Sequence, residues 1–368
     1  MRNESKRSVL LFGGAGFIGS NWAQRLLDST DAQIHIFDNL SREGSLHNVT
    51  WLKSQDREGD RIRVTIGDVR DANAVTKAVR LATEVYNFAA QVAVTTSIKD
   101  PRHDFEVNLQ GTFNILEAAR KSGHAPFLLF TSTNKVYGEM GEHLVSQTKA
   151  RYEYADIAGI TEEQPLNFHS PYGCSKGAAD QYVRDYGRIF GLPTVVFRMS
   201  CIAGARQFGN EDQGWVAHFL YSALENKPVR IYGDGRQVRD ILNVVDLLRA
   251  FEAANASVAT TAGQIYNIGG GAANTTSLLE LAGSIEALTG KKLELEFSDF
   301  RPGDQRIFVT DCSKIRRDTA WTPSLDLKQT LHDIREFWRQ NRELLADQFR
   351  TDGIPEPEVI FDILGRSA

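Results

Sequence analysis

A short apolar segment that runs directly into a glycine-rich turn is the feature that most constrains the fold of this chain. Ser8–Phe12 is predicted to be a β-strand, and a helix is predicted over 16–29. Glycines at 13, 16 and 19 permit a tight turn and a close approach of backbone to a pyrophosphate, which the helix N-terminus attracts. Because this spacing lies between a strand and a helix, it predicts a dinucleotide-binding loop. The loop residues expected to bind are Gly13, Gly16, Phe17, Ile18 and Gly19.

Strand and helix patterns alternate through the first half of the chain. Strands are predicted at 34–37, 63–66, 84–88, 127–130 and 194–197, and helices at 72–80, 104–122 and 171–189, with a polar loop from 38 to about 48. Apolar strands that alternate with helices predict a parallel sheet covered on both faces. We therefore expect an α/β fold: a Rossmann-type doubly wound parallel sheet with a smaller α/β substrate-binding lobe. The predicted sheet domain is 1–198 with 237–265 returning to it, the predicted lobe is 199–236 and 266–343, and 344–368 is a polar tail without chemistry.

Composition and charge narrow the class of protein. The 368 residues are 42% hydrophobic and 24% charged, as in ordinary globular proteins. A formal net charge of −5 argues against a nucleic-acid or anionic-membrane surface. No segment approaches the roughly 18 apolar residues of a membrane span, and the apolar N-terminal run is interpreted as a strand and not as a signal peptide. Cys174, Cys201 and Cys312 fit neither a disulfide framework nor a metal site, so we expect no metal and a cytoplasmic location.

Acidic residues after the second and third strands indicate which dinucleotide binds. Asp38 ends the second strand about 20 residues after the glycine loop, where a carboxylate suits the ribose 2′-hydroxyl and repels a 2′-phosphate. Arg42 lies close by, so NAD is favoured and NADP is not excluded. Asp68 and Val69 follow the third strand and are expected near the adenine ring. A plain helix N-cap is the alternative role for Asp68.

Tyr172 and Lys176 stand four residues apart at the start of the helix predicted over 171–189. Positions i and i+4 share a helix face, so the phenol and the ammonium are expected side by side. A nearby cation should lower the pKa of the phenol from about 10 toward neutrality, where it can take or give a proton. Taken alone, this spacing also fits an ordinary surface helix. The glycine loop and the upstream Thr/Ser cluster favour catalysis.

Together these motifs resemble the extended short-chain dehydrogenase/reductase family, over roughly 8–340. Its nucleotide-sugar branch combines the glycine loop, Tyr-x-x-x-Lys and an upstream Ser or Thr. The segment Thr131–Gly138 matches that branch, with Thr133 in the place of the catalytic hydroxyl. The resemblance implies that the cofactor is also bound by Asn39, Ala89, Ala90, Gln91, Asn108, Tyr172 and Lys176.

The same resemblance implies a nucleotide-sugar substrate. The segments 237–240 and 301–304 match those that hold the diphosphate, and a guanidinium can donate two hydrogen bonds to a phosphate at once. A solvated or salt-bridged role is the alternative for both of their arginines. The substrate-binding residues implied in this way are Thr133, Asn134, Lys135, Cys201, Arg206, Gln207, Arg239 and Arg301.

Within the branch, the run His169–Tyr182 and the segments 206–208 and 212–215 are most similar to 2-epimerases of CDP-linked sugars. Departures at Arg102, Cys201 and Ala203 leave the exact sugar open. In the related 4,6-dehydratases an Asp-Glu pair follows the catalytic threonine and eliminates water. Asn134 and Lys135 occupy those places here, so dehydration is not expected.

The resemblance implies a mechanism in which NAD accepts hydride from C2 and returns it to the other face of the ketone. Tyr172 would move the hydroxyl proton, Lys176 would lower its pKa and bind the nicotinamide ribose, and Thr133 would orient the sugar. The alternatives are epimerisation at C4 or another oxidoreduction of a UDP-, dTDP- or GDP-sugar, and a non-catalytic NAD-binding regulator.

A homodimer joined through the helices 104–122 and 171–189 is also expected, as is usual in this family. The apolar residues that suggest this interface are Phe105, Phe113, Leu116, Tyr182 and Ile189, for which packing on the sheet is the alternative.

Overall fold

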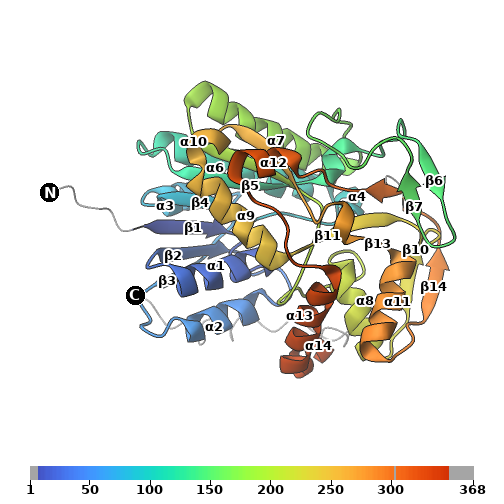
Figure 1. The fold of residues 1–368 in the computed structure, drawn as a ribbon. Helices are drawn as coiled ribbons and strands as arrows, with labels where there is room; N and C mark the ends of the chain where they lie inside the picture. Colours follow the sequence, from blue (N-terminus) through green and yellow to red (C-terminus); the bar gives the residue numbers. More distant parts are fainter. Residues whose placement is uncertain (1–6, 302–303, 348–368) are drawn as a thin grey trace.

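Seven parallel strands form the central sheet of the computed structural model, which describes residues 7–301 and 304–347 (Figure 1). In spatial order they are β12 (Gln264–Ile268), β8 (Thr194–Met199), β5 (Phe127–Thr133), β4 (Glu84–Asn87), β1 (Ser8–Phe12), β2 (Gln33–Asp38) and β3 (Ile62–Ile66). β1 lies between β2 and β4, so successive strands are added on one side of β1 first and then on the other. Ligands of open α/β sheets bind at such a switch point, outside the carboxyl ends of the strands. The predicted doubly wound α/β fold is confirmed.

Helices cover both faces of this sheet. One face carries α1 (Phe17–Ser29), α2 (Ser45–Gln55), α9 (Val244–Ala256) and α12 (Ser313–Thr319), and the other carries α3 (Ala72–Val79), α6 (Gly111–Lys121) and α7 (Ser170–Phe190). Trp22 and Phe251 are buried in the first core, and Val183 and Leu116 in the second. Burying each such side chain contributes about 1.5–3 kcal/mol. Leu116 therefore packs on the sheet and is not part of an exposed apolar surface.

A smaller lobe extends from the carboxyl ends of these strands, on the side of the molecule away from the N-terminus (Figure 1). Its core contains Leu220, Leu281 and Ile334. Its strands are β9 (Cys201–Ala203), β10 (Val229–Tyr232), β11 (Val238–Asn243), β13 (Thr275–Ser277), β14 (Leu295–Ser298) and β15 (Ile307–Phe308), and its helices are α8 (Trp215–Leu224), α11 (Leu278–Thr289), α13 (Leu327–Gln340) and α14 (Arg342–Asp347). A hairpin of β6 (Val145–Gln147) and β7 (Tyr152–Tyr154) reaches this lobe, where the Tyr152 N–H donates to the Arg236 carbonyl at 3.0 Å.

The helix α2 begins inside the segment for which the sequence predicts a polar loop to about residue 48. Ser45, Asn48, Val49 and Leu52 are its buried residues, at spacings of three and four. That spacing forms a stripe along one side of a helix. Two of the four residues are polar, which is why the stripe is hard to recognise in the sequence.

The single helix predicted over 104–122 is divided in the structure. Its parts are α5 (Pro101–Phe105), the π-helix η1 (Glu106–Gln110) and α6, and α4 (Val94–Lys99) precedes them. A π-helix carries one more residue per hydrogen-bonded turn than an α-helix. Within it Asn108 is fully buried and its Oδ1 accepts from the Gln91 N–H at 2.9 Å.

The predicted domain boundaries stay a prediction. Two elements, β12 and α14, cross a predicted boundary, and β11 pairs with strands of the predicted lobe. β12 spans the predicted boundary at 265, and β11 pairs with β9, β13 and β15. The start predicted for the tail falls inside α14, whose Leu345 is buried in the lobe core. The rest of the predicted tail, 348–368, lies outside the described residues.

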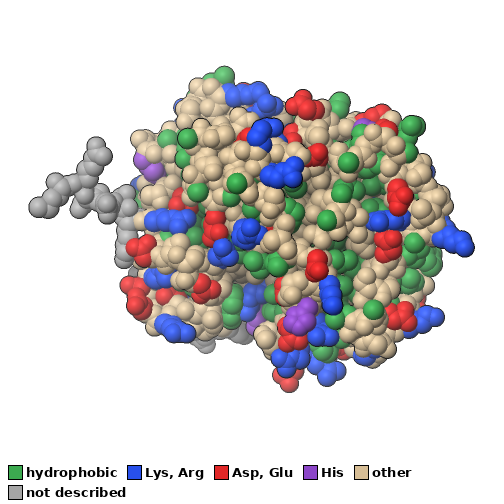
Figure 2. All heavy atoms as spheres, viewed as in Figure 1, with side chains coloured by type: hydrophobic (Ala, Val, Ile, Leu, Met, Phe, Trp, Pro, Cys, Tyr) green, Lys and Arg blue, Asp and Glu red, His purple; other side chains and the backbone are tan. Residues whose placement is uncertain are grey.

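Charged side chains of both signs are interspersed on the face shown in Figure 2. None of the helices in the described part of the chain has the length and hydropathy that a membrane span requires.

Candidate active site

The turn after β1 is packed so closely that it has no room for side chains at two of its glycines. Gly13 has φ +72°, and a Cβ there would lie 2.6 Å from the backbone nitrogen of Ala89. At Gly19 a Cβ would lie 2.5 Å from the Gly13 carbonyl oxygen. The turn opens α1, whose N-terminus has no side-chain cap. Free N–H groups at a helix N-terminus bind phosphate, so this turn is suited to a pyrophosphate.

Asp38 lies at the end of β2, beside this turn. Its carboxylate accepts hydrogen bonds from the N–H of Ala15 at 3.0 Å and of Leu40 at 2.8 Å. Burial raises the pKa of Asp38, and the two N–H groups oppose that rise. A carboxylate fixed at the end of the second strand suits the ribose hydroxyls of NAD.

Asp68 is held by charged and polar neighbours and does not cap a helix. A hydrogen bond from Arg70 is the main cause that lowers the pKa of Asp68 to about 2, and the Asn39 amide also donates to it at 3.3 Å. The N-cap of α3 is Asp71, which accepts from the N–H groups of Asn73 and Ala74. The alternative role of Asp68 as an N-cap is therefore excluded.

A cleft of about 710 Å³ runs along the carboxyl ends of the strands. Ligand pockets usually measure about 300–1,000 Å³. The structure brings most of the predicted site residues to its walls: Gly13, Gly16, Phe17, Ile18, Gly19, Asp38, Asn39, Asp68, Val69, Ala89, Ala90, Gln91, Thr133, Tyr172, Lys176, Cys201, Arg206 and Gln207. Asn108 lies behind Gln91, and its amide nitrogen donates to the Gln91 carbonyl at 3.0 Å.

Tyr172 and Lys176 reach the cleft from the first two turns of α7. Pro171 lies in the first turn, as predicted. The Lys176 amine donates to the Thr131 carbonyl at 2.6 Å and lies 4.1 Å from the centroid of the Phe130 ring. Burial raises the pKa of Tyr172 to about 12 and lowers the pKa of Lys176 to about 7.

The predicted effect of Lys176 on the Tyr172 pKa is wrong for the described chain. Burial has the largest effect on that pKa, and a hydrogen bond with Thr133 and the charge of Arg42 oppose it only in part. Lys176 is not among the groups that shift it, and its amine is bound to the Thr131 carbonyl. A phenol with a pKa of about 12 keeps its proton at pH 7. Positive charge bound in the cleft would lower that pKa.

Thr133 ends β5 and lies within hydrogen-bonding reach of Tyr172. Its hydroxyl donates to the Asn134 amide oxygen at 3.3 Å and accepts from the Lys135 N–H at 3.3 Å. The second bond caps the short 3₁₀ helix η2 (Asn134–Tyr137). The hydroxyl is thus fixed beside the phenol, and its predicted hydrogen bond to a sugar oxygen stays a prediction.

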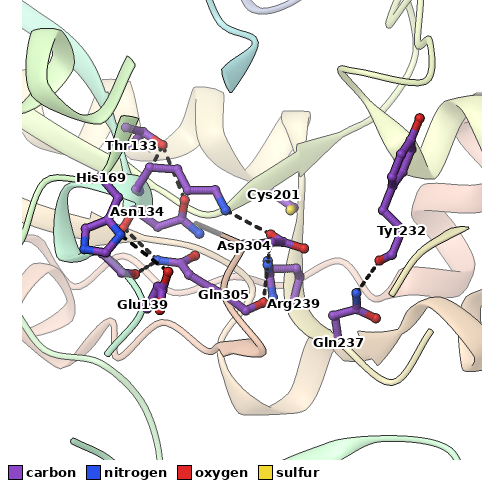
Figure 3. Close-up of polar contacts among 12 residues, drawn as sticks. Thr133, Asn134, Glu139, His169, Cys201, Tyr232, Gln237, Arg239, Asp304 and Gln305 are labelled. Atoms are coloured by element: carbon purple, nitrogen blue, oxygen red, sulfur yellow. Dashed lines mark hydrogen bonds and ion pairs between the residues drawn. The ribbon is translucent and has the colours of Figure 1, made fainter. Parts of the chain in front are cut away.

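Two of the predicted substrate-binding cations share one carboxylate. Asp304 Oδ1 accepts from the Lys135 amine at 3.1 Å and from the Arg239 guanidinium at 2.9 Å. Figure 3 shows Asp304 and Arg239 facing one another, with Cys201 nearby. Burial alone would raise the pKa of Asp304, but the charges of Lys135 and Arg239 lower it. Two cations and one anion leave a net positive charge, which suits a diphosphate.

The two remaining arginines are engaged by other side chains. The Arg206 guanidinium lies 3.0 Å from the centroid of the Trp51 ring and donates to the Asn48 amide oxygen at 3.3 Å, so it joins the lobe to α2. Arg301 is paired with Asp212 at 3.1 Å and stacks on the Tyr232 ring at 3.9 Å. Asn134, Lys135, Arg239 and Arg301 are not in the cleft wall, so their substrate contacts stay predictions.

The cleft wall also contains residues for which the sequence predicts no binding role. Among them are Ser132, Ser200, Phe208 and Trp215. Trp215 belongs to a segment that is similar to 2-epimerases, so a signal was present, and its indole N–H donates to the Cys201 sulfur at 3.3 Å. Ser132 has a buried hydroxyl without a partner among the described residues. A bound dinucleotide fits four features of this site: the glycines at which a side chain would clash, the uncapped N-terminus of α1, Asp38 and the Ser132 hydroxyl.

Comparisons with known proteins find relatives over most of the chain. A family described as GDP-mannose 4,6 dehydratase matches residues 10–334. The CDP-paratose 2-epimerase of Salmonella typhi is 43% identical over 337 residues, which cover 89% of this chain and 98% of that protein.

Two solved structures have the same fold over most of their length. The dTDP-glucose 4,6-dehydratase of Bacillus anthracis in complex with NAD has a TM-score of 0.77 and 29% identity, with 93% of this chain and 99% of that chain covered. The UDP-glucose 4-epimerase of Thermotoga maritima with UDP-glucose has a TM-score of 0.78 and 27% identity, with 91% and 99% covered. The prediction of NAD as the cofactor agrees with the NAD complex. The chain therefore belongs to the GDP-mannose 4,6-dehydratase family within the extended short-chain dehydrogenases/reductases.

Proposed function

We propose that this protein is an NAD-dependent epimerase that inverts C2 of a CDP-linked sugar and converts CDP-paratose to CDP-tyvelose. The proposal depends mainly on one observation: Thr133, Tyr172 and Lys176 line the same cleft. The two residues that follow Thr133 are Asn134 and Lys135, where the related 4,6-dehydratases have an Asp-Glu pair. The 43% identity to the Salmonella typhi CDP-paratose 2-epimerase supports the choice of carbon and nucleotide.

The residues of the cleft divide the binding of cofactor and substrate. The glycine turn and Asp38 would hold the pyrophosphate and the ribose of NAD, and Lys176 would hold the nicotinamide ribose. When bound, NAD supplies a positively charged hydride acceptor that takes the hydride from C2 and gives it back. Lys135 and Arg239 would hold the diphosphate of the sugar nucleotide.

Tyr172 moves the proton. As a phenolate, which positive charge bound in the cleft favours, it takes the proton of the sugar 2-hydroxyl as C2 is oxidised to a ketone, and it returns that proton when the ketone is reduced on its other face. The Thr133 hydroxyl donates to the same sugar oxygen and orients it. Since hydride and proton are both returned, no external oxidant or reductant is consumed.

The two residues after Thr133 protect the ketone from elimination. Loss of water would need a positioned acid and base beside the sugar. Asn134 is an amide, and Lys135 is paired with Asp304. The ketone therefore persists until hydride returns.

The second candidate is a 4-epimerase of a UDP-sugar. The similarity to the Thermotoga maritima UDP-glucose 4-epimerase favours it, but a shared fold does not determine the carbon that reacts. A non-catalytic NAD-binding regulator is the third, and it has no need of Thr133, Tyr172 and Lys176 together.

One labelling experiment tests all three. The protein is incubated with CDP-, UDP-, dTDP- and GDP-sugars, and a CDP-linked 3,6-dideoxyhexose carries deuterium at C2. We expect turnover of the CDP-sugar with deuterium retained at C2 of the product by NMR. Loss of the label to solvent would show proton abstraction from carbon, and turnover of a UDP-sugar alone would favour the second candidate. The Tyr172→Phe variant is the inactive control.

A further inference from the structure

A buried carboxylate lies directly behind the first turns of α7, outside the chemistry assigned above. Asp104 on α5 is fully buried. The Ser175 hydroxyl donates to its Oδ2 at 2.5 Å, and the amide groups of Gln91 and Asn108 each donate to its Oδ1 at 3.0 Å. The two amides and the Ser175 hydroxyl can all donate to it, and this arrangement favours an ionised carboxylate, which accepts on both oxygens.

The charge of Asp104 is not neutralised by a paired cation. No salt bridge to Asp104 is found in the part of the chain that the structure describes. Asp180, the other fully buried carboxylate near Lys176, differs because Arg198 donates to both of its oxygens at 2.7 and 3.0 Å. A buried charge is costly unless it is compensated, so the charge of Asp104 needs an electrostatic partner nearby.

That partner is Lys176. Burial lowers the pKa of Lys176, and the charges of Asp180 and Asp104 both act against this effect. The charge of Lys176 in turn lowers the pKa of Asp104, which burial raises. Asp180 has the larger of these two effects and is itself paired with Arg198, so Asp104 is the one of the two anions without a paired cation.

Hydrogen bonds also fix the turn of α7 that carries both catalytic residues. Ser175 directly precedes Lys176, and its hydroxyl lies 3.2 Å from the Tyr172 carbonyl. The Asn108 amide donates to that hydroxyl at 3.1 Å as well as to Asp104. Asn108 lies in the π-helix η1, a type of irregularity that is frequent at functional sites.

We propose that Asp104 is a positioning residue of this active site: its negative charge keeps the Lys176 amine protonated, and its bond to Ser175 fixes the turn that carries Tyr172 and Lys176. The other charged or titratable groups around this pair are His103 on α5, Tyr172 and Asp180 on α7, and Arg42 in the loop after β2. The kinetic test of this proposal rests on the proposed function, whereas the titration of Lys176 does not.

The first test titrates Lys176 without any sugar substrate. In protein labelled with ¹³Cε-lysine, the Lys176 resonance is the one that disappears in Lys176→Met. In Asp104→Asn we expect the pKa of Lys176 to fall by about one unit, as for removal of a nearby opposite charge. The matched control is Asp100→Asn, which removes an exposed charge from the N-cap of the same helix while asparagine can still cap it. An unchanged Lys176 pKa in folded Asp104→Asn would overturn the proposal.

The second test measures kcat against pH. Asp104 raises the pKa of Tyr172 as well as that of Lys176, so its neutralisation should move both limbs of the profile to lower pH. A merely structural role would reduce kcat or the melting temperature and leave the limbs in place. A shift in the lysine titration with no turnover of any CDP-sugar would retain this proposal and refute the function proposed above.

A third measurement needs no substitution and covers the case in which Asp104→Asn does not fold. The ¹³Cγ resonance of Asp104 in the wild-type protein, assigned through the backbone, reports its ionisation. We expect it to remain ionised throughout the pH range in which Lys176 titrates. A protonated Asp104 in that range would overturn the proposal.

Discussion

Replacing Lys176 by methionine should stabilise the NAD-free protein while it impairs turnover. Lys176 is 3% exposed, and burial lowers its pKa from 10.5 to about 7. In the unfolded chain the amine keeps its ordinary pKa, so between pH 7 and 10.5 the unfolded state binds more protons than the folded state. Stability therefore rises with pH across this range, and the cost of burying the amine is fully present below about pH 7.

The size of the effect follows from the pKa difference and the contacts that methionine loses. The difference between 10.5 and about 7 corresponds to about 5 kcal/mol. Methionine loses the hydrogen bond to the Thr131 carbonyl, which costs about 1–3 kcal/mol. It also loses the cation–π contact with Phe130, about 1 kcal/mol. A net stabilisation of about 2 kcal/mol remains at pH 7, an example of stability given up for activity.

Thermal unfolding of the NAD-free wild type and of NAD-free Lys176→Met from pH 6 to 10 measures this difference in stability. We expect Lys176→Met to melt above the wild type at pH 7 and the gap to close as the pH rises. Lys77→Met, at an exposed lysine of α3, is the matched control and should show no such pH dependence. A variant that melts below the wild type at pH 7, or a gap that does not change with pH, would refute the reasoning.

Three further predictions concern catalysis, the cofactor and assembly. Tyr172→Phe should lower kcat by about 10²–10⁴-fold and leave NAD binding intact, because only one oxygen is removed; retention of more than about a tenth of kcat would show that Tyr172 is not the base. NAD should bind more tightly than NADP because the Asp38 carboxylate repels a 2′-phosphate, and equal affinities in fluorescence titrations in one buffer would contradict this. The protein should be a homodimer, because the rings of Phe113 on α6 and Tyr182 on α7 are in contact and are 41% and 45% exposed. A monomer mass in light scattering at micromolar concentration would contradict this prediction.

Much of the fold and of the cofactor site could be predicted because it depends on neighbours in the sequence. The glycine turn needs Gly13 and Gly19 within one short segment, and the strand before it and the helix after it are read from adjacent residues. The face shared by Tyr172 and Lys176 follows from helix geometry alone. Buried parallel strands are unbroken apolar runs, so their positions were visible as well.

The irregular elements were less predictable, because their local patterns are ambiguous. The buried stripe of α2 includes Ser45 and Asn48, whose polarity suggests a loop. The π-helix that divides the helix 104–122 places Asn108 against Gln91, a contact between residues 17 apart in the sequence. Nothing in the composition of that helix marks the extra residue.

By itself the sequence determined six of the seven strands of the central sheet, the glycine turn and the pairing of Tyr172 with Lys176 on one helix face. The tertiary structure alone decided the charge states and contacts at the site. It raised the pKa of Tyr172, although the sequence predicted a fall, and it joined Lys135 to Asp304 across 169 residues. The physical reason is that spacing along a helix or turn fixes only local geometry. A pKa depends on burial and on every charge nearby, and both are set by segments that come together only when the chain folds.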